Sequence, residues 1–364
     1  MTATLAAGAP RDAWRSRLTF VLATCGGAVG LGNLWRFSYV AGENGGGAFV
    51  IVYLGIVLLV GAPLVMAELA LGRRGQASPL TSMRRMTAEA GGKTIWNFVG
   101  WFSVLAPMGA LMFYAVVAGW SLEYLMQAVG GRFQGISAAE AGAAFDTLLA
   151  SPLRLLLWHT LFMAGTIFVV ALGLQKGIEP VTTFMMPALF LMILALATYA
   201  HVAGAPAEAW RFLFTPDFSK LTAESWLVAL GQALFSVTIG TGALLTYGGY
   251  LGDHDSLLKP AWQIVIADTG IALVAGLAIF PIVFASGLDP GQGPGLMFVT
   301  LPLALGQMPG GYFIAIMLFV TVFFAAFTSA LAMLEPFVGY LEEPIEYRTH
   351  DRLPRQPIRG GLKR

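Results

Sequence analysis

The stretch Cys25-Gly-Gly-Ala-Val-Gly-Leu-Gly-Asn-Leu-Trp-Arg36 lies inside an otherwise apolar segment, residues 18–40. A helix that is rich in glycine and carries Asn and Arg in its second half is expected to break. In a bilayer, the backbone groups that a break exposes are tolerated only where they line a cavity or hold an ion. The stretch therefore predicts an ion and substrate site inside a membrane protein.

The composition indicates an integral membrane protein. Of the 364 residues, 57% are hydrophobic and 11% are charged, with a mean hydropathy of +0.73, whereas a soluble domain carries about 25% charged residues. The net charge is +1 and no basic patch alternates with aromatic residues, so a nucleic-acid partner is not expected. The single cysteine, Cys25, excludes an intramolecular disulfide.

Eight apolar segments have the roughly 20 residues that a bilayer crossing needs. They are residues 18–40, 46–72, 96–128, 153–173, 178–202, 226–252, 260–287 and 311–341. We expect residues 1–343 to form one transmembrane core and the basic, Pro-rich residues 344–364 to form a tail. The residues before the first segment lack the pattern of a cleaved signal peptide.

The loop charges predict the orientation. One set of loops is rich in basic residues: Arg11, Arg15, Arg17, Arg73, Arg74, Arg84, Arg85, Lys93, Lys176 and Lys259. The other set has fewer basic residues and several acidic ones: Arg132, Arg154, Arg211, Lys220, Glu140, Asp146, Glu208, Asp217 and Glu224. The positive-inside rule then predicts a multi-pass protein of the plasma (inner) membrane with both termini in the cytoplasm.

A second interruption, Ser236-Val-Thr-Ile-Gly-Thr-Gly242, lies in the sixth segment. Corresponding breaks in two halves of a chain are typical of transporters built from inverted repeats, with the binding site between the breaks. We therefore expect an all-α membrane protein with a five-plus-five inverted-repeat core and broken spans one and six. Only three spans follow from the sixth onward, where five are needed, so the chain is expected to stop early.

Carboxylates at membrane depth are costly and are candidates for function. Asp268 can bind a cation, take up a proton, or be a hydrogen-bonded structural acid. Glu68 either braces a neighbouring broken span or binds a ligand directly. Glu335 is expected in packing or a water network, and Glu123 at a helix interface.

Side-chain oxygens at membrane depth suit a hard monovalent cation, which prefers oxygen ligands. They are supplied by Asn33, Ser236, Asp268, Thr328 and Ser329. No nucleophile–base pair, phosphate loop or cofactor fingerprint is present in the sequence, so we expect neither an enzyme nor a cofactor other than coupling ions.

Three motifs resemble the opening signature of the neurotransmitter:sodium symporter family. They are Arg11-Asp-Ala-Trp14, Gly27-Ala-Val-Gly-Leu-Gly-Asn-Leu-Trp-Arg-Phe37 and Glu43-Asn-Gly-Gly-Gly-Ala-Phe49. Gly231-Gln-Ala-Leu-Phe-Ser236 and Ala325-Ala-Phe-Thr-Ser-Ala330 support the resemblance, which extends from Arg11 to Glu343. The broken-helix argument above rests on the same family of transporters.

The resemblance implies two sodium sites. One would use the Ala28 carbonyl, Asn33, Ser236 and Asp268, completed by a substrate carboxylate. The other would use the carbonyls of Gly26, Val29 and Ala325 and the hydroxyls of Thr328 and Ser329.

The resemblance also implies a substrate site between spans one, three, six and eight. The amides of Leu31 and Gly32 and the Tyr114 hydroxyl would hold a carboxylate, with Phe235 as a lid. The remaining pocket residues would be Gly27, Ala28, Ala110, Ser236, Thr238, Thr241, Ser329 and Met333. Monoamine members carry Asp at the position of Gly30, so glycine there implies a substrate with its own carboxylate: an amino acid, in a roomy pocket that favours apolar or aromatic side chains.

The gates are expected to differ from the family pattern. Arg11 would pair with Glu343 on the inner side, but the acidic partner of Arg36 in the outer gate would belong to a missing tenth span. The implied function is sodium-coupled import of an amino acid by alternating access. The alternative is a truncated, transport-inactive chain that acts at most as a binding or assembly partner. A channel is disfavoured by the occluding Tyr114 and Phe235, and the oligomeric state stays open.

Overall fold

The computed structural model describes residues 13–252, 256–293 and 295–343, and all regular elements in these ranges are helical. The tail from residue 344 lies outside them. The long helices are α6 (Asn97–Val129), α8 (Pro152–Ala171), α9 (Glu179–Ala203), α13 (Leu258–Ala285) and α15 (Gly311–Glu342). The shorter helices are α1 (Arg17–Ala28), α2 (Phe37–Glu43), α3 (Gly47–Ile56), α4 (Ala62–Gly75), α5 (Pro79–Glu89), α7 (Ala138–Leu149), α10 (Pro206–Phe214), α11 (Ala223–Ser236), α12 (Ala243–Gly249) and α14 (Leu301–Gln307).

Short π-helical and 3-10 turns extend several of these helices. The π turns are η1 (Gly32–Arg36), η2 (Val57–Gly61), η4 (Leu174–Ile178) and η6 (Leu296–Thr300), and the 3-10 turns are η3 (Thr94–Trp96) and η5 (Phe218–Lys220). Within the described residues, six helices are long and apolar enough to cross a membrane: Gly47–Gly75, Thr94–Val129, Pro152–Ala171, Leu174–Ala203, Leu258–Ala285 and Gly311–Glu342.

The first span is broken as predicted. Arg17–Ala28 and Gly32–Glu43 together meet the criteria for one crossing but are bent by 50° at residues 29–31. Seven of the eight predicted spans thus have a counterpart that is long enough to cross. The all-helical, multi-pass character of the protein is confirmed.

The sixth predicted span is two short helices, α11 and α12, separated by residues 237–242. Thr238, Gly240 and Gly242 in this break have φ values of 55°, 81° and 70°. These left-handed conformations interrupt the helix, and only glycine adopts them readily. A Cβ on Gly242 would lie 2.1 Å from the carbonyl oxygen of Ser103 on α6, so glycine is also needed for the close approach of the two backbones.

Four short helices, α5, α7, α10 and α14, occupy segments that the sequence analysis treated as loops. The start of α7 carries a recognisable signal, Ser137-Ala-Ala-Glu140. The Ser137 hydroxyl accepts from the Glu140 amide at 3.3 Å, and the Glu140 carboxylate accepts from the Ser137 amide at 2.9 Å. The backbone N–H and the hydroxyl of Ser137 both donate to the Glu140 carboxylate and lower its pKa.

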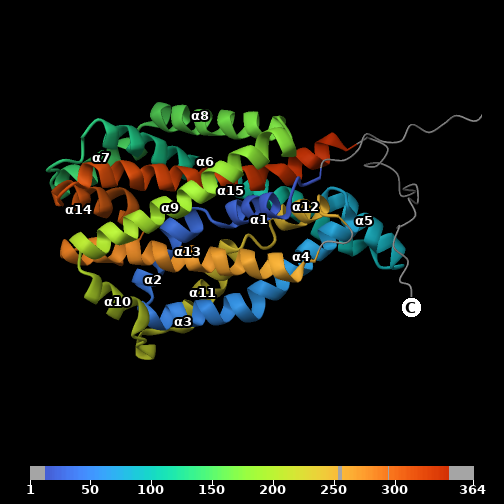
Figure 1. Cartoon of the computed structure of the whole chain (residues 1–364), viewed down its shortest axis with the longest axis horizontal. Helices are drawn as coiled ribbons and strands as arrows, with labels where there is room; N and C mark the ends of the chain where they lie inside the picture. The colour runs from blue at the N-terminus through green and yellow to red at the C-terminus, as the bar shows by residue number, and fades with distance from the viewer. Residues whose placement is uncertain (1–12, 253–255, 294, 344–364) are drawn as a thin grey trace, which may run out of the picture.

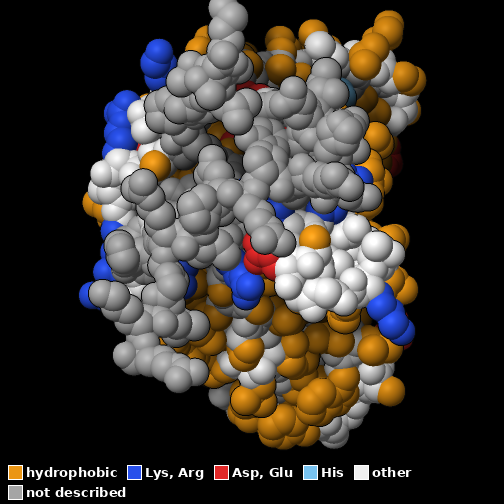
Figure 2. Space-filling view, turned by 90° about the vertical axis from the view of Figure 1, so that its right-hand side faces the viewer, with side chains coloured by type: hydrophobic (Ala, Val, Ile, Leu, Met, Phe, Trp, Pro, Cys, Tyr) orange, Lys and Arg blue, Asp and Glu red, His pale blue; other side chains and the backbone are white. Residues whose placement is uncertain are grey.

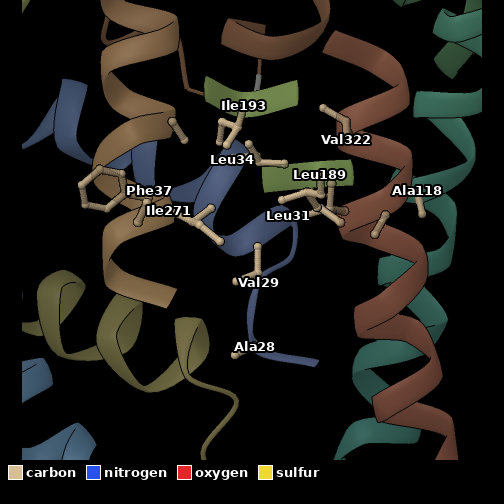
Figure 3. Packing of buried hydrophobic residues seen from close by; sticks show 14 of the residues in the cluster. Ala28, Val29, Leu31, Leu34, Phe37, Ala118, Leu189, Ile193, Ile271 and Val322 are labelled. Carbon is tan, nitrogen blue, oxygen red and sulfur yellow. The ribbon is translucent and has the colours of Figure 1, made fainter. Parts of the chain in front are cut away.

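The broken first span lies at the centre of the molecule, with α9, α13 and α15 around it (Figure 1). Figure 3 shows the side chains of these helices that surround the segment from Ala28 to Phe37: Leu189, Ile193, Ile271 and Val322.

In Figure 1, α5 lies at one end of the molecule and α7, α10 and α14 lie at the other. Figure 2 views the end with α5, where Lys and Arg side chains gather above a hydrophobic flank. We call this end the predicted cytoplasmic side.

Candidate functional site

Asn33 joins the two broken spans to α13. Its Nδ2 donates to Ser236 Oγ at 3.0 Å, to the Asp268 carbonyl at 3.0 Å and to Asp268 Oδ1 at 2.7 Å. Its Oδ1 accepts from the backbone N–H of Gly30 at 3.0 Å, inside the first break. Three acceptor oxygens from two other helices therefore converge on one point beside the break.

Asp268 is fully buried on α13 and faces the end of α11. Its Oδ2 accepts from the Ser236 hydroxyl at 2.7 Å, and Tyr53 of α3 lies 3.4 Å from the same hydroxyl. No lysine, arginine or histidine forms an ion pair with Asp268 among the described residues. A buried carboxylate held only by neutral donors is costly at membrane depth, so Asp268 stays a candidate for cation binding, for proton uptake or for a structural role.

A second group of oxygens lies where α15 meets the end of α1. Ser329 Oγ is 3.2 Å from the Gly26 carbonyl and 3.3 Å from the Val29 carbonyl. Thr328 Oγ1 is 3.3 Å from the Ala325 carbonyl. The Val29 carbonyl is available to Ser329 because the helix stops at Ala28. Ser329 thus bridges two predicted carbonyls at the end of α1, whereas the Thr328 hydroxyl bonds back within α15, to the Phe324 carbonyl at 3.0 Å as well as to Ala325.

Tyr114 of α6 also contacts the first break. The Leu31 N–H donates to the Tyr114 hydroxyl at 3.3 Å. A Cβ on Gly30 would lie 2.4 Å from Ser329 Oγ and 2.8 Å from the Tyr114 hydroxyl. The space beside Gly30 is therefore lined by two hydroxyl groups, and a larger residue there would require at least one of them to move.

The other predicted pocket residues lie on the same helices. Met333 is 4% exposed on α15, and a Cβ on Gly27 would lie 2.8 Å from Ala332 Cβ next to it. Thr238 is 5% exposed, and its carbonyl accepts from Thr241 Oγ1 at 2.7 Å within the second break. Ala110 lies on α6, one turn before Tyr114, and Ala28 ends α1.

Arg36, the predicted outer gate residue, is held by α11. Its Nη1 donates to Gln232 Oε1 at 2.5 Å, and its guanidinium carbon lies 5.6 Å from the centroid of the Phe235 ring. Gln232 Nε2 also donates to the Gly32 carbonyl at 2.9 Å. Gln232 was not among the predicted site residues, although it lies one helical turn before Ser236 and so shares its face.

The predicted inner gate pairs Arg11 with Glu343 at the end of α15. Arg11 lies outside the described residues. Glu343 accepts hydrogen bonds from the Ser78 hydroxyl at 2.8 Å and from Thr81 Oγ1 at 2.5 Å, both at the start of α5. The carboxylate of Glu343 therefore caps that helix on the predicted cytoplasmic side.

The other three carboxylates at membrane depth, Glu68, Glu335 and Glu123, make hydrogen bonds or ion pairs that hold helices together. Glu68 Oε1 accepts from the Gly240 N–H at 2.7 Å, so Glu68 braces the second break. Glu335 accepts from the Tyr250 hydroxyl at 2.7 Å. Glu123 joins α6 to α8 through an ion pair with Arg154 and a hydrogen bond from the Trp158 indole.

Comparisons with known proteins identify the family of this chain. The sequence profile of the "Sodium:neurotransmitter symporter family" matches residues 11–135 and 150–356. The chain is 40% identical over 326 residues to the "uncharacterized sodium-dependent transporter YhdH" of Bacillus subtilis, covering 90% of this chain and 71% of the relative. It is 30% identical over 341 residues to an "uncharacterized sodium-dependent transporter" of Haemophilus influenzae, covering 92% and 75%.

A solved structure has the same fold. The crystal structure of MhsT in complex with L-phenylalanine is 43% identical in sequence, with a TM-score of 0.84 over 91% of this chain and 75% of that one. Membership in a transporter family agrees with the expectation that the chain is not an enzyme. The chain belongs to the sodium:neurotransmitter symporter family of sodium-dependent membrane transporters.

Proposed function

We propose that this protein is a sodium-coupled symporter that imports an apolar or aromatic amino acid by alternating access. The observation that carries the proposal is the meeting of Asn33, Ser236 and Asp268 between the two breaks. Broken helices at membrane depth provide ion ligands from both backbone and side chains, and the site lies between the elements that move.

The first sodium ion would be held by Asn33, Ser236, Asp268 and the Ala28 carbonyl. The oxygens of Ser236 and Asp268 already converge on Asn33 Nδ2. Because an Asn side chain presents an oxygen when its amide is rotated, Asn33 can exchange its donor for an acceptor when a cation enters. The donor set is all oxygen, which fits sodium and does not favour a transition metal.

The second sodium ion would be held by the carbonyls of Gly26, Val29 and Ala325 and the hydroxyls of Thr328 and Ser329. All five groups are neutral, and Ser329 already bridges two of the carbonyls. A site without a carboxylate binds a cation weakly enough for release after transport.

An amino acid substrate would place its carboxylate near the first break. The Leu31 and Gly32 amides and the Tyr114 hydroxyl are hydrogen-bond donors there, and the Leu31 amide already lies 3.3 Å from that hydroxyl. Gly30 contributes no side-chain carboxylate that would repel the substrate. The L-phenylalanine bound in the structure of MhsT supports a large apolar or aromatic side chain.

Coupling would follow from shared contacts. A substrate carboxylate beside the first sodium ion raises the affinity for sodium, and sodium raises the affinity for substrate by the same factor. A sodium gradient then drives amino acid uptake because the two are bound and released together.

The test is uptake into proteoliposomes that contain the full chain. A mixture of labelled amino acids is offered with an inward sodium gradient, and a potassium gradient serves as the control. We expect accumulation only with sodium, and competition by unlabelled phenylalanine or leucine. Absence of accumulation from correctly inserted protein would contradict the proposal and favour a transport-inactive chain with a binding or assembly role.

We also expect transport to be independent of chloride. The fixed carboxylate of Asp268 supplies a negative charge beside the first sodium site, so an external anion is not required there. Replacing chloride by gluconate in the uptake assay should leave the initial rate unchanged. A large fall in rate would show that Asp268 does not serve as this charge.

A further inference from the structure

A buried carboxylate on α9 holds the start of α1. Glu179 is 2% exposed at the N-terminal end of α9. Its Oε1 accepts from the backbone N–H of Arg15 at 2.8 Å and from Thr19 Oγ1 at 3.1 Å. The Arg15 Nε lies 3.5 Å from Glu179 Oε2. These contacts are separate from both predicted sodium sites and from the substrate site.

Two further contacts hold the residues that precede α1. Gln175 Nε2 donates to the Ala13 carbonyl at 2.9 Å, and the Trp14 indole donates to the Tyr247 carbonyl of α12 at 3.0 Å. Beside Glu179 lies an open groove of about 320 Å³, lined by Arg15, Thr19, Glu179, Pro180, Thr183 and Phe184. The contact between α1 and α9 thus consists of hydrogen bonds to the Glu179 carboxylate, and the open groove lies directly beside it.

Glu179 contacts α1 at the end that lies farthest from the first break, so this contact is sensitive to any movement of α1 about the break. The helix α1 runs from Arg17 to Ala28 and ends at the bend of 50°. If α1 moves about this bend, its far end, where Glu179 binds, moves most. Hydrogen bonds weaken steeply once their geometry is lost, so the contact is either made or broken.

We propose that Glu179 is a positioning residue of alternating access, a latch that keeps α1 docked on α9 and so keeps the predicted cytoplasmic path closed. The proposal rests on the transport function proposed above for the direction of the motion. When α1 leaves α9, the hydrogen bonds from Arg15 and Thr19 are lost together. The groove beside Glu179 then widens and becomes part of the predicted cytoplasmic path. Removing the carboxylate therefore shifts the population towards the open form.

The single cysteine is a native reporter of this motion. Cys25 lies on α1 and is 5% exposed, packed in the core that α1 shares with α9, α13 and α15. The measurement is the rate of Cys25 alkylation by N-ethylmaleimide in the full-length protein, first without sodium and then with saturating sodium. Two hydrogen bonds to the carboxylate are lost in Glu179→Ala. Because both are partly exposed to solvent, we expect a small effect for each and alkylation without sodium about tenfold faster.

Alkylation in the presence of sodium distinguishes a variant in which α1 is released from a variant whose fold is damaged. In Glu179→Ala, saturating sodium should return alkylation towards the wild-type rate, because the carbonyls of Gly26 and Val29 proposed to hold the second ion lie at the end of α1, and an ion bound there would fix α1 against α15. Glu179→Gln keeps an acceptor oxygen without the charge and should give an intermediate rate. The control is Glu89→Ala, which removes an exposed ion pair with Arg74 on the same side and should leave the rate unchanged.

An unchanged sodium-free rate in both Glu179 variants would overturn the latch, as would fast alkylation that sodium does not slow although it slows the wild type. Absence of sodium protection in the wild type would instead contradict the proposed sodium coupling. The sodium-free comparison between wild type and variants would still decide the role of Glu179.

Discussion

Replacing Asp268 by alanine should abolish sodium-driven uptake. The carboxylate accepts one hydrogen bond from Asn33 and one from Ser236, each at 2.7 Å. Its loss removes the only charged side chain among the residues predicted for the first sodium site and takes the acceptor away from the Ser236 hydroxyl, whereas Asn33 Nδ2 keeps the Asp268 carbonyl and Ser236 Oγ as acceptors. The attraction between a carboxylate and a cation about 4 Å apart is about 4 kcal/mol at an effective dielectric constant of about 20, so we expect sodium affinity to fall at least about 100-fold.

Substrate affinity should fall with it, because the two ligands are coupled at this site. The measurement is equilibrium binding of labelled amino acid over a sodium titration. Asp268→Asn keeps an acceptor oxygen and the shape of the side chain, and should retain part of the affinity. Asp217→Ala removes an exposed aspartate that caps η5 and should bind like the wild type. Sodium dependence in Asp268→Ala equal to that of the wild type would refute the shared site.

Replacing Gly30 by alanine should weaken substrate binding about 100-fold. The added Cβ would lie 2.4 Å from Ser329 Oγ and 2.8 Å from the Tyr114 hydroxyl, well inside contact distance. Either hydroxyl must move, and each makes hydrogen bonds to the first break, to Val29 and Leu31 respectively. Losing both arrangements at a cost of roughly 3 kcal/mol lowers affinity about 100-fold.

The matched control is Gly109→Ala on α6, where a Cβ would meet no atom within 4 Å. This variant adds the same methyl group to a membrane helix and should transport like the wild type. Thermal unfolding of both variants in detergent separates lost binding from lost folding. Wild-type uptake by Gly30→Ala would show that the space beside Gly30 is not part of the site.

The helical spans and the two breaks could be predicted because they are local properties. Apolar runs of sufficient length identify a crossing whatever surrounds them, and glycine-rich polar stretches interrupt a helix by their own backbone preferences. The bend after Ala28 and the break over 237–242 both lie inside the predicted stretches. The start of α7 could also be predicted, because Ser137 and Glu140 have the spacing of a capping box, although the sequence analysis treats this segment as a loop.

The pairing of groups across helices could not be predicted in the same way. Gln232 contacts both Arg36 and the Gly32 carbonyl, and Glu179 contacts Arg15, 164 residues earlier in the chain. Neither residue stands out by type or spacing. Each acquires its partners only when α11 packs against the first break or α9 packs against α1.

The sequence by itself determined that this protein crosses the membrane, where its helices break, and which oxygen-bearing residues lie at membrane depth. Those properties depend on hydropathy and backbone preference, which act over a few residues. Only the tertiary structure decided that Asp268 and Ser236 share one hydrogen bond, that Arg36 is held by a glutamine, and that a buried carboxylate docks α1. Such contacts depend on how whole helices pack, because side chains far apart in the chain meet only there.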